Sequence, residues 1–171
     1  MHAERVGNPV VLSWLAAVAS EIHANARDEH VTLVALDEAK RLLHGGTGQA
    51  QPAWFDYYDN TRFHGFEGYA LLRLGRWAEA ERQLDGALRS LPSTALKQRT
   101  VFLTDLASVS IRQGDIDHAC DVAVDAANAL TAQPYATSMQ RLRNLRSDLA
   151  PYAKSRAVRQ LDDAIAQLQS A

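Results

Sequence analysis

The chain has 171 residues, 47% hydrophobic and 22% charged, which fits one globular domain with a buried core. Its 18 basic and 20 acidic side chains give a formal net charge of −2, so we expect no direct nucleic-acid contact, since phosphate neutralisation supplies most of the affinity for DNA. A single cysteine excludes an intramolecular disulfide. With no signal-peptide pattern and no run of roughly twenty apolar residues, we expect a cytoplasmic protein that does not enter the membrane.

Apolar residues at three- and four-residue spacing predict helices along almost the whole chain. A first pair of helices is expected over residues 10–44, where a glycine-rich stretch ends it. An aromatic loop is predicted over residues 45–60. Three further pairs are predicted over residues 61–91, 94–131 and 136–169, with their ends at glycine or proline. The prediction is therefore an all-α single domain of about four antiparallel helix hairpins.

The second and third predicted hairpins share an internal repeat with a period of 39 residues, measured from Gly75 to Gly114. A period of this length is typical of stacked helix pairs, each of which buries its apolar face against the next. The two glycines give the backbone the freedom that a tight turn needs. Small residues recur seven positions before and five positions after each glycine, which predicts close approach of the helices at Gly68, Ala107, Ala80 and Ala119.

The stretch from Gln113 to Ala119 (Gln-Gly-Asp-Ile-Asp-His-Ala) resembles the turn and second helix of the tetratricopeptide repeat. This resemblance implies a short right-handed solenoid, with a concave groove lined by the first helix of each hairpin. The outer hairpins depart from the pattern, as terminal caps do. In the first, Arg27 or Asp28 stands where the turn glycine would be. In the last, Pro151 and Tyr152 are expected to make the turn.

A wider set of residues looks like the C-terminal repeat region of actinobacterial transcriptional regulators that carry an Xre-type helix-turn-helix. The set is Trp54-Phe55-Asp56-Tyr57-Tyr58-Asp59, Gly68-Tyr69, Leu74-Gly75-Arg76, Leu91-Pro92, Leu103-Thr104-Asp105-Leu106-Ala107 and Leu142-Arg143-Asn144-Leu145-Arg146. That resemblance implies a region that senses a ligand or mediates dimerisation. No helix-turn-helix fits before Val10, so we expect either the sensor region alone or a stand-alone relative.

Repeat spacing also predicts which side chains face the groove: Trp14, Glu21, Arg62, Tyr69, Arg73, Thr104, Ser108 and Arg112. Arg73 and Arg112 each precede a turn glycine by two positions and would lie one above the other. Such a pair suits a carboxylate or a peptide C-terminus. The alternative is that a basic residue is simply common at this position of the repeat.

The aromatic loop leaves two alternatives open. Trp54, Tyr57 and Tyr58 could form a lid or a cage that faces a ligand, or they could plug the seam between the first two hairpins. The histidines lack the spacing of a metal-binding helix, so no metal or cofactor is expected.

Together these patterns favour a non-catalytic domain that binds a protein, a peptide or a small effector. Its expected role is the sensing or dimerisation part of a bacterial transcriptional regulator. Two alternatives stay open: an adaptor or assembly scaffold acting through protein–protein contacts, including a homodimer, and an enzyme. An enzyme would require a deep pocket with a perturbed acid or base.

Overall fold

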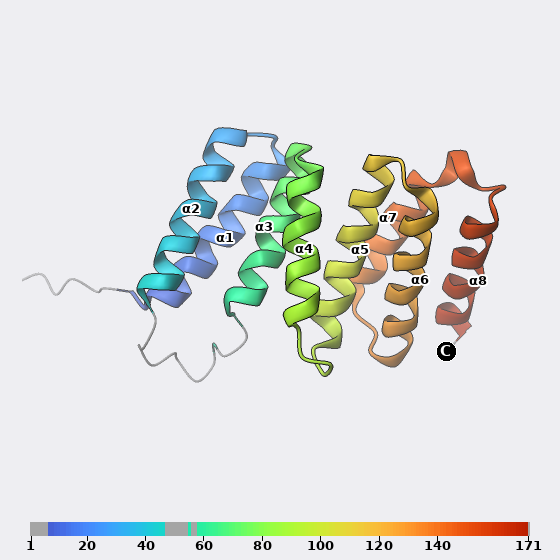
Figure 1. The fold of residues 1–171 in the computed structure, drawn as a ribbon. Coiled ribbons are helices and arrows are strands. Elements are labelled where there is room, and N and C mark those ends of the chain that lie inside the picture. Colours follow the sequence, from blue (N-terminus) through green and yellow to red (C-terminus); the bar gives the residue numbers. More distant parts are fainter. Residues whose placement is uncertain (1–6, 47–54, 56–57, 171) are drawn as a thin grey trace, which may run out of the picture.

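A computed structural model describes residues 7–46, 55 and 58–170 of the chain. Over these residues it contains eight α-helices, which follow one another as a row of antiparallel pairs (Figure 1). They are α1 (Pro9–Asn25), α2 (Glu29–Gly45), α3 (Asn60–Leu74), α4 (Trp77–Ser90), α5 (Leu96–Gln113), α6 (Ile116–Ala132), α7 (Ala136–Asp148) and α8 (Arg156–Ser170). The predicted all-α architecture is confirmed. In the part of the chain described, no helix has both the length and the apolar character needed to cross a membrane.

Three of the turns between paired helices share one backbone geometry. Gly75 and Gly114 have φ angles of 81° and 86°, in the left-handed region. Arg27 takes the same conformation, with φ 59°, between α1 and α2. In all three turns the next residue's amide donates to the carbonyl five residues back, at 2.9–3.0 Å, as in a Schellman motif. Arg27, and not Asp28, is therefore the counterpart of the turn glycines.

Paired helices approach closely where the repeat spacing predicts small residues. A Cβ atom on Gly68 would lie 2.6 Å from Cγ of Leu84, closer than two carbon atoms can pack. In the first pair the equivalent positions, seven before and five after the turn residue, hold Ser20 and Thr32, which are both fully buried. Each of their hydroxyls donates to a carbonyl of its own helix at 2.6 Å. The first pair therefore follows the same packing plan with small polar residues.

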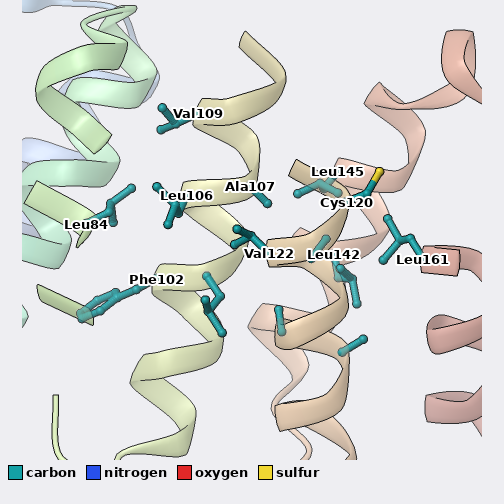
Figure 2. Close-up of a cluster of buried hydrophobic side chains, with 14 of the residues drawn as sticks. Leu84, Phe102, Leu106, Ala107, Val109, Cys120, Val122, Leu142, Leu145 and Leu161 are labelled. Atoms are coloured by element: carbon teal, nitrogen blue, oxygen red, sulfur yellow. The ribbon is translucent and has the colours of Figure 1, made fainter. Parts of the chain in front are cut away.

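Two hydrophobic clusters hold the row of helices together. The larger runs from α3 to α8 and includes the leucines that α4, α5, α7 and α8 contribute in Figure 2. The smaller joins α1, α2 and α3 and contains Phe55, Tyr58 and Phe63. At the C-terminal end, α8 packs mainly on α6 while α7 packs mainly on α5. The last pair is therefore more open than the others, and a short 3₁₀ helix (Ala150–Tyr152) separates its members.

Candidate binding cleft

Helices α1, α3, α5 and α7 lie side by side and line a face with two adjoining hollows. The first, of about 260 Å³, is the aromatic hollow, lined by Glu21, Tyr58, Arg62, Gly65, Phe66, Lys97, Gln98, Val101, Phe102, Asp105, Tyr135 and Arg141. The second, of about 420 Å³, is the arginine hollow, lined by Arg27, Tyr69, Leu72, Arg73, Gly75, Trp77, Asp105, Ser108, Arg112, Arg141, Asn144, Leu145 and Asp148. Because Asp105 and Arg141 line both hollows, the two adjoin at these residues, and together they are called the cleft.

A buried ion pair stands at the boundary between the hollows. Arg141 of α7 donates a hydrogen bond to the carboxylate of Asp105 of α5, which is 4% exposed. The Arg141 guanidinium also lies over the ring of Tyr69 of α3, 4.7 Å from the ring centroid. Burial raises the pKa of Asp105 to about 6, although the charge of Arg141 opposes the rise. This pair therefore links three of the four cleft-lining helices.

Glu21 of α1 presents a carboxylate to the aromatic hollow. Burial raises the pKa of Glu21 to about 6, while the charge of Arg141 lowers it and that of Asp105 raises it. No hydrogen bond or ion pair joins Glu21 to any residue that the structure describes. Glu21 is thus a partly desolvated acceptor with room for a partner from outside the chain.

Arg62 of α3 brings an unused donor to the same hollow. Its Nε atom is buried and has no hydrogen-bond partner in the described part of the chain. The guanidinium reaches Asp59 only at 3.5 Å, between Nη1 and Oδ2. Phe66, Phe102 and Tyr135 are among the apolar residues that line this hollow. The aromatic hollow is therefore lined by apolar side chains, by an arginine with one buried donor that has no partner among the described residues, and by the partly exposed carboxylate of Glu21.

Six of the eight side chains predicted to face the groove line the cleft. Glu21 and Arg62 line the aromatic hollow, and the other four line the arginine hollow: Tyr69, Arg73, Ser108 and Arg112. Arg112 is tied to Asp148 at 2.9 Å, between Nη2 and Oδ2. Tyr69 donates its hydroxyl to Oδ1 of Asn25 at 2.9 Å, across from α3 to α1.

Trp14 and Thr104 do not line either hollow, so these two predictions are corrected. Trp14 packs edge-on against Phe55, with ring centroids 5.6 Å apart. Thr104 is 1% exposed, and its hydroxyl donates to the carbonyl of Val101 within the same helix. Thr104 stands ten residues before its turn glycine, as Gly65 does in α3, and Gly65 lies at the contact between neighbouring first helices. Gly65 nevertheless lines the aromatic hollow, whereas Thr104 is buried and lines neither hollow.

Of the three residues considered for a lid, Trp54 and Tyr57 lie outside the described residues. Tyr58 is 1% exposed, and its hydroxyl lies 3.0 Å from Oγ of Ser13, which donates to the carbonyl of Ala39. Burial raises the pKa of Tyr58 to about 12. Tyr58 is therefore a plug between the first two hairpins and part of the cleft wall, and the lid interpretation is wrong for this residue.

Sequence reasoning missed Asp105, Arg141 and Arg27 as cleft residues. One signal was available: Asp105 stands within an otherwise uncharged stretch, where a carboxylate requires a partner when buried. Both ion pairs between α5 and α7 also join residues 36 positions apart, close to the repeat period. An acid and a base separated by roughly one repeat were therefore candidates for pairing between successive first helices.

Stacked helix pairs and a charged, aromatic-lined cleft along their first helices define the class of this protein as an all-helical hairpin stack. Comparison of the chain with protein-family models, with curated proteins and with solved structures gave no match. In the described residues, no group of three or more His, Cys, Asp or Glu side chains could hold a metal ion.

Proposed function

We propose that this protein is a non-catalytic binding module of the tetratricopeptide type, whose cleft takes a peptide segment of a partner protein or a small effector. The observation that carries the proposal is that one aromatic-walled hollow is lined both by Arg62, whose buried Nε has no partner among the described residues, and by the partly exposed carboxylate of Glu21. Buried polar groups without partners are rare and unfavourable, so their presence in a cavity favours a ligand that satisfies them.

The size and the lining of the cleft favour binding over catalysis. A hollow of about 260 Å³ holds a small molecule or one or two side chains, and the adjoining hollow extends it. Burial does raise the pKa of Glu21 and Asp105 in this hollow, as an enzyme would require, but no histidine, serine or cysteine is among the described residues that line it. The resemblance to Xre-type regulators supports a sensing role in transcriptional control.

Glu21→Gln and Arg62→Gln should each weaken ligand binding by about tenfold, because each removes one charge-assisted hydrogen bond. The ligands to use are peptides selected by phage display and small molecules found by thermal shift, with affinity measured by calorimetry. Asp125→Asn is the control, since Asp125 is an exposed residue of α6 that lines neither hollow. Ligands whose affinity is the same in both cleft variants and in wild type would contradict a site in the aromatic hollow.

An exposed apolar stripe on α1 favours the second candidate function, assembly with another copy of the chain. Leu12, Leu15 and Ile22 are 39%, 50% and 63% exposed, and none of them lines the cleft. Over its 17 residues α1 carries only Glu21 and His23 as titratable groups, so two such stripes could pack without like-charge repulsion.

This assembly predicts a dimer at micromolar concentration that Leu15→Glu or Ile22→Glu dissociates, as measured by sedimentation velocity. Tyr152→Glu serves as the control, because Tyr152 is a comparably exposed apolar residue at the other end of the stack. Wild-type protein that sediments as a monomer at every concentration would exclude the assembly function and leave the cleft proposal untouched.

A further inference from the structure

Arg27 occupies a backbone position that disfavours arginine. Its φ of 59° lies in the left-handed region, where the two equivalent turns hold glycine. A side chain with a Cβ atom is strained there, whereas glycine is not. Backbone strain at a residue that also lines a cavity is a reason to examine what its side chain contributes. The Arg27 side chain lines the arginine hollow.

The charges around the arginine hollow do not balance. It is lined by four arginines but by only two carboxylates, those of Asp105 and Asp148, and it includes no lysine or glutamate. Asp105 is bonded to Arg141 and Asp148 to Arg112. Arg27 and Arg73 make no ion pair or hydrogen bond through their side chains with any described residue. The hollow therefore has a net positive charge, carried by two guanidinium groups that are free to bind a ligand.

Neutral hydrogen-bonding groups complete the lining. Ser108 and Asn144 also line this hollow. The Ser108 hydroxyl already donates to the carbonyl of Thr104 at 2.9 Å, and Oδ1 of Asn144 accepts from Nε2 of Gln140, so the amide N–H groups of Asn144 remain as donors. A guanidinium presents its N–H groups as a planar fork that matches two oxygens of a carboxylate or a phosphate. Arg27, Arg73 and the side-chain amide of Asn144 are therefore hydrogen-bond donors of the kind that recognises oxyanions.

We infer that the arginine hollow binds an anionic group, a carboxylate or a phosphate, through Arg27 and Arg73. This inference rests on the proposed function, because it names the chemistry that the bound peptide or effector presents to one half of the cleft. It also moves the expected anion contact from the pair Arg73 and Arg112 to Arg27 and Arg73, since Asp148 already neutralises Arg112. On this inference, arginine is retained at the strained position 27 because glycine there would have no guanidinium to bind the anion.

The test uses pyrophosphate and citrate as separate probes, titrated into the whole chain at low ionic strength, where charge interactions are least screened. Nuclear magnetic resonance follows the amides of the turn around Arg27. Arg27→Gly and Arg73→Ala should each weaken binding of the preferred probe by about tenfold. Arg27→Gly should at the same time keep or raise the melting temperature, because it relieves the strained turn. A larger effect on citrate indicates a carboxylate site, and a larger effect on pyrophosphate a phosphate site.

Arg89→Ala is the matched control, since Arg89 is an exposed residue of α4 outside both hollows and its loss changes the net charge equally. Wild-type protein that binds neither probe at about 10 mM, a concentration above a weak dissociation constant of about 1 mM, overturns the inference. An equal loss of affinity in Arg27→Gly and Arg89→Ala overturns it as well. These results are distinguishable from failure of the proposed function. Loss of the anion site leaves the effects of Glu21→Gln and Arg62→Gln on selected ligands in place.

Discussion

Replacing Arg141 with methionine should lower the free energy of unfolding by about 3–5 kcal/mol at pH 7.5, as measured by urea denaturation. Methionine keeps an unbranched side chain beside Tyr69 but removes the guanidinium that bonds to Asp105. The Asp105 carboxylate is 4% exposed, so it would be left as a buried charge without its partner. Breaking a buried pair on one side is much less favourable than removing both charges.

The double variant Asp105→Asn with Arg141→Met is the control, and it should recover part of the lost stability because no buried charge remains. If the double variant were as unstable as the single one, packing and not charge would explain the loss. A single variant with wild-type stability would show that the pair contributes nothing.

The same pair gives the stability a defined pH dependence. Burial raises the pKa of Asp105 from 3.8 to about 6, so the folded state binds this proton more tightly than the unfolded state. Above pH 6 the charged carboxylate lowers the free energy of unfolding by its full amount. This loss of stability disappears as the pH falls toward 4, so acidification favours folding through this group. Glu21, whose pKa burial also raises to about 6, acts in the same direction. Without Arg141 the pKa of Asp105 rises further. The loss of unfolding free energy caused by Arg141→Met should therefore be smaller at pH 5 than at pH 7.5.

Gly65→Ala should destabilise the protein by about 1–3 kcal/mol, although alanine favours a helix over glycine by about 1 kcal/mol. A Cβ atom at this position would lie 2.1 Å from Cε1 of Phe102, so either the Phe102 ring or the helices that carry the two residues would have to move. Because both residues line the aromatic hollow, the substitution should also weaken binding of any ligand held there. Thermal and urea unfolding measure the first effect, and calorimetry measures the second.

Gly86→Ala in α4 is the matched control. A Cβ atom there would meet nothing within 4 Å, so helix propensity alone should act and raise stability by about 0.5–1 kcal/mol. Combining Gly65→Ala with Phe102→Leu should restore part of the lost stability, because the smaller side chain leaves room for the methyl group. Equal stabilisation by Gly65→Ala and Gly86→Ala would contradict the close approach of α3 and α5.

Local patterns in the sequence were sufficient to predict the helices and the main turns. The spacing of apolar residues predicted helices, and Gly75 and Gly114 predicted tight turns, because both depend on residues only a few positions apart. The small residue at Gly68 predicted a close approach that the contact with Leu84 confirms. Each of these features is visible in one helix pair, without knowledge of how neighbouring pairs are arranged.

The cleft itself depended on the tertiary structure. The rotation of each first helix decides whether a residue lines a hollow, as Ser108 does, or is buried away from it, as Thr104 is four residues earlier. Pairing of Asp105 with Arg141 joins residues 36 positions apart, and the counterpart of the turn glycines proved to be Arg27. The sequence by itself thus determined that this chain forms stacked helix pairs. Only their packing decided which charges meet in the cleft and which remain free, because those contacts join different pairs.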